Sequence, residues 1–136
     1  MNIQKQNTIR HTLLLEATLA DNTNQRRMEM EPVSRHLGRH LLRTGNLDSY
    51  CVFATTYLDI NVIADFRGRK NMPFYDTQDY TKSVDGMKII PLQTEELKKI
   101  IKSETRYKVL FSLFEEAFNS PLQPHEWYDN TIIRAF

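Results

Sequence analysis

Residues 13–56 read LLLEATLADNTNQRRMEMEPVSRHLGRHLLRTGNLDSYCVFATT, with a short apolar run at either end of a long polar and basic segment. The first run belongs to residues 8–18, where leucine and β-branched residues predict a strand. The second run, YCVFATT at residues 50–56, predicts a short buried strand. The turn formers of residues 20–25 predict a loop after the first strand.

The segment between these strands predicts a helix over residues 32–43. Pro32 is tolerated in the first turn of a helix, and Gly45 followed by Asn46 is a common helix end. Apolar residues at every fourth position predict the buried face of this helix: Val33, Leu37 and Leu41. Arginines with the same spacing form a second, basic stripe: Arg35, Arg39 and Arg43.

The rest of the chain continues the alternation of helices and strands. The expected elements, in order, are a helix over 59–66, a strand over 87–92, and helices over 94–103, 106–119 and 123–135. Residues 67–86 are polar, and a long excursion of this kind is often functional or mobile. The order of elements predicts an α/β fold in which helices cover a small sheet.

Length and composition restrict the class of protein. A chain of 136 residues is the size of a single domain. No apolar run is long enough to span a membrane, and the N-terminus lacks the features of a signal peptide. One cysteine, Cys51, permits no internal disulfide and no cysteine zinc cluster, so a cytoplasmic setting is expected. Residues 1–45 hold seven Lys/Arg against four Asp/Glu, which hints at a basic face there.

Carboxylates and basic residues gather around the first strand and the basic helix. Glu16 ends an apolar strand, where a carboxylate is costly unless it is paired or binds a metal. Glu29 and Glu31 precede the predicted helix, and His36 lies on its first turns. A strand carboxylate with carboxylates from a helix start suits a hard cation such as Mg²⁺, which activates water in phosphodiester hydrolysis.

Simpler interpretations stand beside this one. Glu16 would end a strand in solvent, Glu29 and Glu31 would only favour a helix N-terminus, and His36 would pack. His36 and His40 form an H-x-x-x-H pair, but the glutamate that follows the first histidine in zinc proteases is absent. Cys51 lies in a predicted buried strand and is expected to pack rather than react.

Basic and aromatic residues also have two interpretations each. The stripe of Arg35, Arg39 and Arg43 is either a solvated helix face or a set of phosphate contacts. Basic residues in the polar excursion are a second candidate DNA contact: Arg67, Arg69 and Lys70. The C-terminal aromatic residues predict core, or an interface with another domain: Phe114, Phe118, Trp127 and Tyr128.

One family brings these residues together. The run L-L-E-x-T-L at 14–19, then Gln25, Glu29, Glu31-Pro32-Val33 and Arg35-His36, resembles the cleavage domain of AlwI-type restriction endonucleases, which include type IIS enzymes, nicking relatives and small subunits of heterodimeric enzymes. YCVFATTYLDINVIADF and IIPLQTEELKKII are also similar to this family. The resemblance implies a PD-(D/E)xK restriction-endonuclease-like core, a mixed sheet flanked by helices, with C-terminal helices added.

The resemblance also implies roles for individual residues. Glu16 and Glu29 would ligate Mg²⁺, for which Mn²⁺ may substitute. His36 would be the active-site histidine, and Thr18 would stand where many enzymes of this superfamily place a lysine. Gln25 and Arg35 match positions beside these residues, and Arg35 would contact a phosphate.

One ligand of the superfamily is missing from its expected place. An aspartate should lie about a dozen residues before Glu16, yet residues 1–15 contain no Asp or Glu, and Ile3 stands near that position. We therefore expect residues 1–136 to be one cleavage domain that lacks its N-terminal strand and an upstream DNA-recognition domain.

The resemblance implies Mg²⁺-dependent hydrolysis of phosphodiester bonds in double-stranded DNA, as a type IIS cleavage domain or small subunit. Cutting both strands would need a second active site, from a homodimer or from a heterodimer with a large recognition or nicking subunit. The alternative is a catalytically incomplete fragment or degenerate relative that binds DNA or another subunit without hydrolysis.

Overall fold

The computed structural model describes the backbone of residues 12–18 and 22–136, and the side chains of residues 12–17 and 32–136. Its centre is a three-stranded sheet in the order β1-β2-β5. The strands are β1 (Thr12–Thr18), β2 (Ser49–Thr55) and β5 (Ile89–Gln93), and both neighbouring pairs are parallel. The prediction of a single mixed sheet is corrected, because the central sheet is parallel and the antiparallel pairing occurs in a separate two-stranded hairpin.

Strand β2 is buried along its whole length because it lies between the other two strands. This confirms the strand predicted from YCVFATT, with its start one residue earlier. Strand β5 carries Pro91, which has no N–H to give to a sheet; Pro91 is tolerated because β5 is the edge strand of the described sheet.

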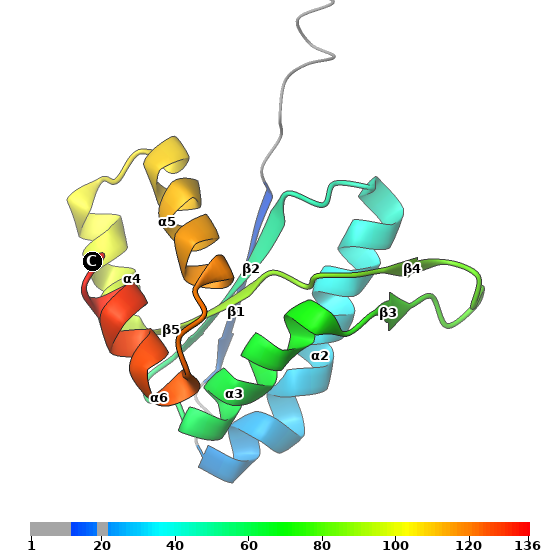
Figure 1. The fold of residues 1–136 in the computed structure, drawn as a ribbon, viewed down its shortest axis with the longest axis horizontal. Helices are drawn as coiled ribbons and strands as arrows, with labels where there is room; N and C mark the ends of the chain where they lie inside the picture. The colour runs from blue at the N-terminus through cyan, green and yellow to red at the C-terminus, as the bar shows by residue number, and fades with distance from the viewer. Residues whose placement is uncertain (1–11, 19–21) are drawn as a thin grey trace, which may run out of the picture.

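Helices cover both faces of the sheet and confirm the α/β class. Figure 1 shows α2 (Asn22–Thr44) and α3 (Ile60–Gly68) on one side of the strands and α4 (Thr94–Ser103) and α5 (Tyr107–Asn119) on the other. The chain ends with α6 (Pro124–Trp127) and a π-helical segment, Tyr128–Ile133. A single 3₁₀ turn, Arg69–Asn71, follows α3.

The start of α2 corrects the sequence prediction. The helix begins at Asn22 and contains Pro32, so the loop expected over residues 20–25 is wrong for the residues from 22 onward. Residues 25–31, QRRMEME, are strong helix formers, and their summed propensity outweighs one proline. The predicted end is confirmed, since Gly45 adopts a left-handed φ of 67° and its N–H donates to Leu41 O at 2.9 Å.

The polar excursion contains a β-hairpin that the sequence did not predict. Its strands, β3 (Phe74–Tyr75) and β4 (Ser83–Val84), are two residues each, too short for an alternating pattern to show. The hairpin lies beside α2, as Figure 1 shows, and its Phe74 ring packs against the helix at Gly38. A Cβ atom on Gly38 would come within 2.3 Å of the Phe74 ring, so the hairpin packs here because position 38 has no side chain.

Candidate functional site

Glu16 and His36 meet where α2 crosses β1. His36 Nδ1 lies 2.5 Å from Glu16 Oε1, and the two side chains are 47% and 31% exposed. The contact joins residues twenty apart in sequence, and it exists because α2 packs antiparallel to β1 in a strand-helix-strand unit. Glu16 is therefore a partly exposed carboxylate held by a histidine, as expected for a paired strand carboxylate.

The second histidine of the H-x-x-x-H pair has a different partner. His40 Nε2 lies 3.0 Å from Ser49 Oγ, while His36 is held by Glu16. Among the residues whose side chains the structure describes, no group of three or more His, Cys, Asp or Glu could hold a metal ion. The pair of histidines thus shows no arrangement of the zinc-protease kind.

Cys51 lies on the neighbouring strand β2, opposite Leu14 of β1 in the register of the sheet. Its side chain is fully buried, and the pKa of its thiol is raised to about 12, first by burial and then by the negative charge of Glu16. Its burial confirms that Cys51 packs in the core, and the raised pKa of the thiol disfavours the reactive thiolate at neutral pH.

Three of the candidate residues have side chains outside the described part of the structure. Thr18 is the last residue of β1 and pairs with Thr55 in the register of the sheet. Gln25 and Glu29 belong to α2, so the expectation that Glu29 precedes the helix is corrected. Position 29 comes seven residues before His36, which is about two helical turns along the same face.

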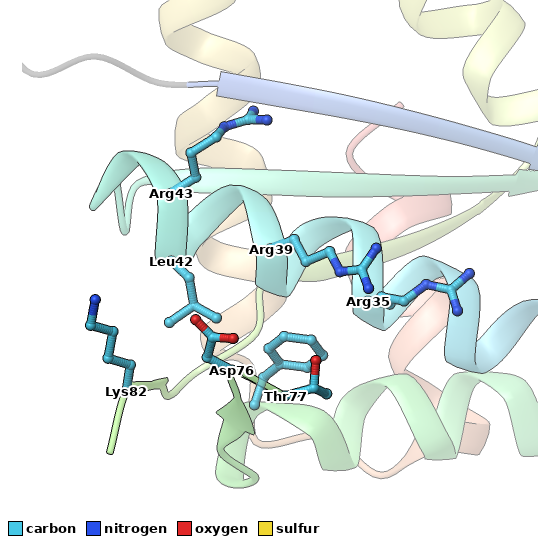
Figure 2. Close-up of a pocket in the computed structure, with 8 residues that line it drawn as sticks. Arg35, Arg39, Leu42, Arg43, Asp76, Thr77 and Lys82 are labelled. Carbon is cyan, nitrogen blue, oxygen red and sulfur yellow. The ribbon is translucent and has the colours of Figure 1, made fainter. Parts of the chain in front are cut away.

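The arginine stripe lines a groove between α2 and the hairpin. The groove has a volume of about 260 Å³. Its walls come from α2 on one side and from the hairpin on the other: Arg35, Arg39, Leu42, Arg43, Phe74, Asp76, Thr77 and Lys82. Figure 2 shows the arginines in a row along α2, with Asp76, Thr77 and Lys82 around the hairpin side.

Sequence reasoning missed the hairpin half of this groove. No local pattern connects Lys82 or Thr77 to α2, because the contact depends on a fold that brings together residues about forty apart. The one available signal was Gly38, a glycine inside a predicted helix, which often marks a close approach by another element.

Arg67 has a structural role that corrects its reading as a DNA contact. Its guanidinium donates to the carbonyl oxygens of Ala117 at 3.0 Å, Phe118 at 3.2 Å and Ser120, which end helix α5. The same group lies 4.9 Å from the centre of the Trp127 ring. Arg67 thus ties α3 to the C-terminal helices and is not presented to a ligand.

The C-terminal aromatic residues form part of the core, which was one of their two interpretations; the other was an interface with another domain. Trp127 is fully buried, and its Nε1 donates to Ala117 O at 2.8 Å. Tyr128 donates its hydroxyl to the buried Glu96 and accepts from the backbone N–H of Gln93 at 2.7 Å.

A parallel three-stranded sheet between helices, with a carboxylate on its edge strand and a row of arginines on the helix that supplies its histidine partner, suits an enzyme or a binding protein that acts on a polyanion. The family model described as AlwI restriction endonuclease matches residues 7–100, more than half of the sequence. The chain therefore belongs to the AlwI restriction endonuclease family, which makes its role nuclease-related.

A solved structure shares the fold. The crystal structure of the small subunit (R.BspD6I2) of the heterodimeric restriction endonuclease R.BspD6I superposes with a TM-score of 0.70 at 18% identity. The match covers 91% of this chain and 63% of that subunit, so the chain spans less than two thirds of its structural relative. It confirms the expected restriction-endonuclease-like fold. No curated protein matches the sequence, and no helix in the described part of the chain is long and apolar enough to cross a membrane.

Proposed function

We propose that the chain is a Mg²⁺-dependent endonuclease that hydrolyses phosphodiester bonds in double-stranded DNA, as a type IIS cleavage domain or a small subunit. The observation that carries the proposal is the contact between Glu16 on edge strand β1 and His36 on α2. This contact lies in a fold that the chain shares with a restriction enzyme subunit. Membership of the AlwI family supports the reaction class. DNA as substrate also implies action in the cytoplasm.

The chemistry of Glu16 fits a hard divalent cation. Carboxylate oxygens are the ligands that Mg²⁺ prefers, and Glu16 is one-third exposed with one of its oxygens against His36. Glu29 is the second proposed ligand, since its position lies on the same face of α2 as His36. Bound Mg²⁺ would lower the pKa of a water molecule and neutralise charge on the phosphate, and Mn²⁺ would substitute for it.

The side chains around this site have separate tasks in the proposal. His36 orients the Glu16 carboxylate through Nδ1, and its other ring nitrogen would transfer a proton or contact a phosphate oxygen. Thr18 occupies the strand position two residues after Glu16, so any base must come from His36 or from bound water. Gln25 and Arg35 would contact the DNA backbone and position the scissile phosphate.

The test is nicking of supercoiled plasmid by the purified chain in Mg²⁺ or Mn²⁺, with EDTA as the first control. We expect open-circular DNA only with metal, and loss of nicking in His36→Gln. The matched control is His125→Gln, because His125 is an exposed histidine of α6, an element that carries none of the candidate site residues. Metal-independent nicking, or equal nicking by wild type and His36→Gln, would contradict the proposal.

A second candidate function is a DNA-binding or subunit-binding module without hydrolysis. It is favoured by the sequence, since residues 1–15 contain no Asp or Glu where the superfamily places its first carboxylate ligand. Mn²⁺ titration followed by electron paramagnetic resonance separates the two functions. The nuclease predicts a site weakened by Glu16→Gln and by Glu29→Gln, whereas the module predicts binding that neither change affects.

Assembly follows from the reaction proposed. One active site cuts one strand, so cutting both strands requires a homodimer or a heterodimer with a large subunit that recognises or nicks DNA. The structural relative is the small subunit of a heterodimeric enzyme, which favours the second arrangement.

A further inference from the structure

We propose that the groove between α2 and the β3–β4 hairpin is a track for the phosphates of one DNA strand, and that the hairpin supplies its second wall through Lys82 and Thr77. The inference rests on the proposed function for its substrate, double-stranded DNA. It goes beyond that function because it assigns the hairpin, which neither the sequence nor the family match connects with a ligand, a part in DNA binding.

Charge is the first argument for the track. The lining contains three arginines and Lys82 against one carboxylate, Asp76. Among the described residues, Arg39, Arg43 and Lys82 form no salt bridge. Asp76 Oδ1 accepts from the N–H of Gln78 at 2.9 Å, so this carboxylate serves the turn of the hairpin. The groove thus keeps a net positive charge for an outside anion.

The spacing of the cations is the second argument. Arg35, Arg39 and Arg43 follow one another by four residues, which is about 6 Å along a helix and about 12 Å from first to last. DNA advances about 3.4 Å along its axis per phosphate of each strand, so a duplex whose axis lies parallel to α2 would present three or four phosphates of one strand over this length. The groove is also smaller than the roughly 300–1,000 Å³ of small-molecule pockets.

Backbone hydrogen bonds fix the shape of the hairpin, which brings Lys82 to the groove that the arginines line. The N–H of Asp76 donates to Lys82 O at 2.9 Å, and the N–H of Lys82 donates to Asp79 O at 3.0 Å. Asp79 in turn accepts from the N–H of Thr81 at 3.0 Å, which closes the turn. Phe74 lies against the helix at Gly38, so the hairpin has a fixed place beside α2.

The track also leads to the candidate active site. Arg35, its end residue, is adjacent in sequence to His36, which holds Glu16. A strand bound along the arginines would therefore pass within one helical turn of His36, and phosphate contacts there would set its position without reading sequence.

The test is fluorescence anisotropy of a labelled DNA duplex of arbitrary sequence, titrated with the chain in EDTA from about 50 to about 200 mM salt. EDTA prevents metal-dependent hydrolysis, so binding is measured apart from catalysis. With four phosphate contacts, log Kobs should fall with log salt with a slope of about −3.6. Lys82→Ala should reduce the slope to about −2.7 and weaken binding about eightfold at 0.1 M salt.

The matched control is Lys98→Ala, which removes the same charge from an exposed site on α4, across the sheet from the groove. We expect it to bind as wild type does, and Arg39→Ala to behave as Lys82→Ala does. If Lys82→Ala keeps the wild-type affinity and slope, the hairpin is not part of the track. If no groove variant changes DNA binding, the groove serves another ligand, such as an acidic protein surface, and the inference is wrong.

Failure of the inference and failure of the proposed function are distinguishable. Metal-dependent nicking with salt slopes that no groove variant changes would overturn only the track. If the chain does not nick DNA, but its wild-type salt slope is as predicted and is reduced by Lys82→Ala and by Arg39→Ala, the result would support the track and contradict the nuclease.

Discussion

Replacing Gly38 with alanine tests whether the hairpin is held against α2 in the way the structure shows. A Cβ atom there would lie 2.3, 2.5 and 2.6 Å from three atoms of the Phe74 ring. Carbon atoms pack at about 3.5–4.0 Å, so the ring or the hairpin must move by about 1 Å or more. Overpacking of this size costs about 1–3 kcal/mol, against which alanine gains up to about 1 kcal/mol of helix propensity.

Gly68 provides a matched control for the same change. It ends α3 with a helical φ of −67°, and a Cβ atom there would meet nothing within 4 Å. Gly68→Ala should therefore raise the free energy of unfolding by about 0.4–1 kcal/mol. Measured by urea denaturation, Gly38→Ala should be less stable than Gly68→Ala by about 1–3 kcal/mol, and it should bind DNA more weakly.

A second change identifies the cause. Adding Phe74→Ala to Gly38→Ala removes the ring that the new methyl group meets, so the two changes should couple favourably by about 0.5–3 kcal/mol. The reasoning is refuted if Gly38→Ala is as stable as Gly68→Ala, or if the effects of the two changes simply add.

Three further predictions concern groups outside the groove. Burial raises the pKa of the Cys51 thiol to about 12, so Cys51 should react with a thiol reagent at pH 8 only when urea unfolds the chain. Because the pKa in the folded state lies above the usual 9.0, the contribution of this thiol to the free energy of unfolding is complete below about pH 9. That contribution is lost as the pH rises toward 12. Arg67→Ala should destabilise the fold by about 1–3 kcal/mol in urea denaturation, by leaving the carbonyls that end α5 without a donor, while DNA affinity stays unchanged. Tyr128→Phe should cost about 1–3 kcal/mol in the same assay, because the buried Glu96 loses its hydroxyl donor; wild-type stability would contradict this account of the contact.

The elements with strong local signals were predictable from the sequence. Strand β2 has an apolar centre, and α5 has a clear helical period, so each was placed within one residue of its observed bounds. The end of α2 was predictable for a similar reason, because Gly45 is suited to the left-handed conformation that ends a helix.

The elements that were missed depend on context that no short window contains. The start of α2 was misplaced because Pro32 and the turn formers before it were given more weight than the helix formers between them. The hairpin has only four strand residues, and its position is fixed by Phe74 packing on a glycine more than thirty residues away. Tertiary contacts of this kind are not encoded in hydrophobic periodicity.

The candidate site was predictable only where its residues carry a local sequence signal. Glu16 stood out as a charge ending an apolar strand, and the structure brings His36 to it. Lys82 and Thr77 gave no signal, because their place beside the arginines follows from the fold alone. Arg67 was misread because a half-buried arginine that donates to the end of another helix and an exposed arginine on a DNA surface look alike in sequence.

The central claim is that Glu16 serves a metal-dependent nuclease, and the nicking rate of Glu16→Gln on supercoiled plasmid tests it most directly. The change keeps the size of the side chain and removes its charge, and Glu95→Gln on the exposed face of α4 makes the same change away from the site. We predict a rate about 100-fold or more below wild type for Glu16→Gln and a wild-type rate for Glu95→Gln, in parallel preparations with equal folding by circular dichroism. Equal nicking by Glu16→Gln and wild type would contradict the claim.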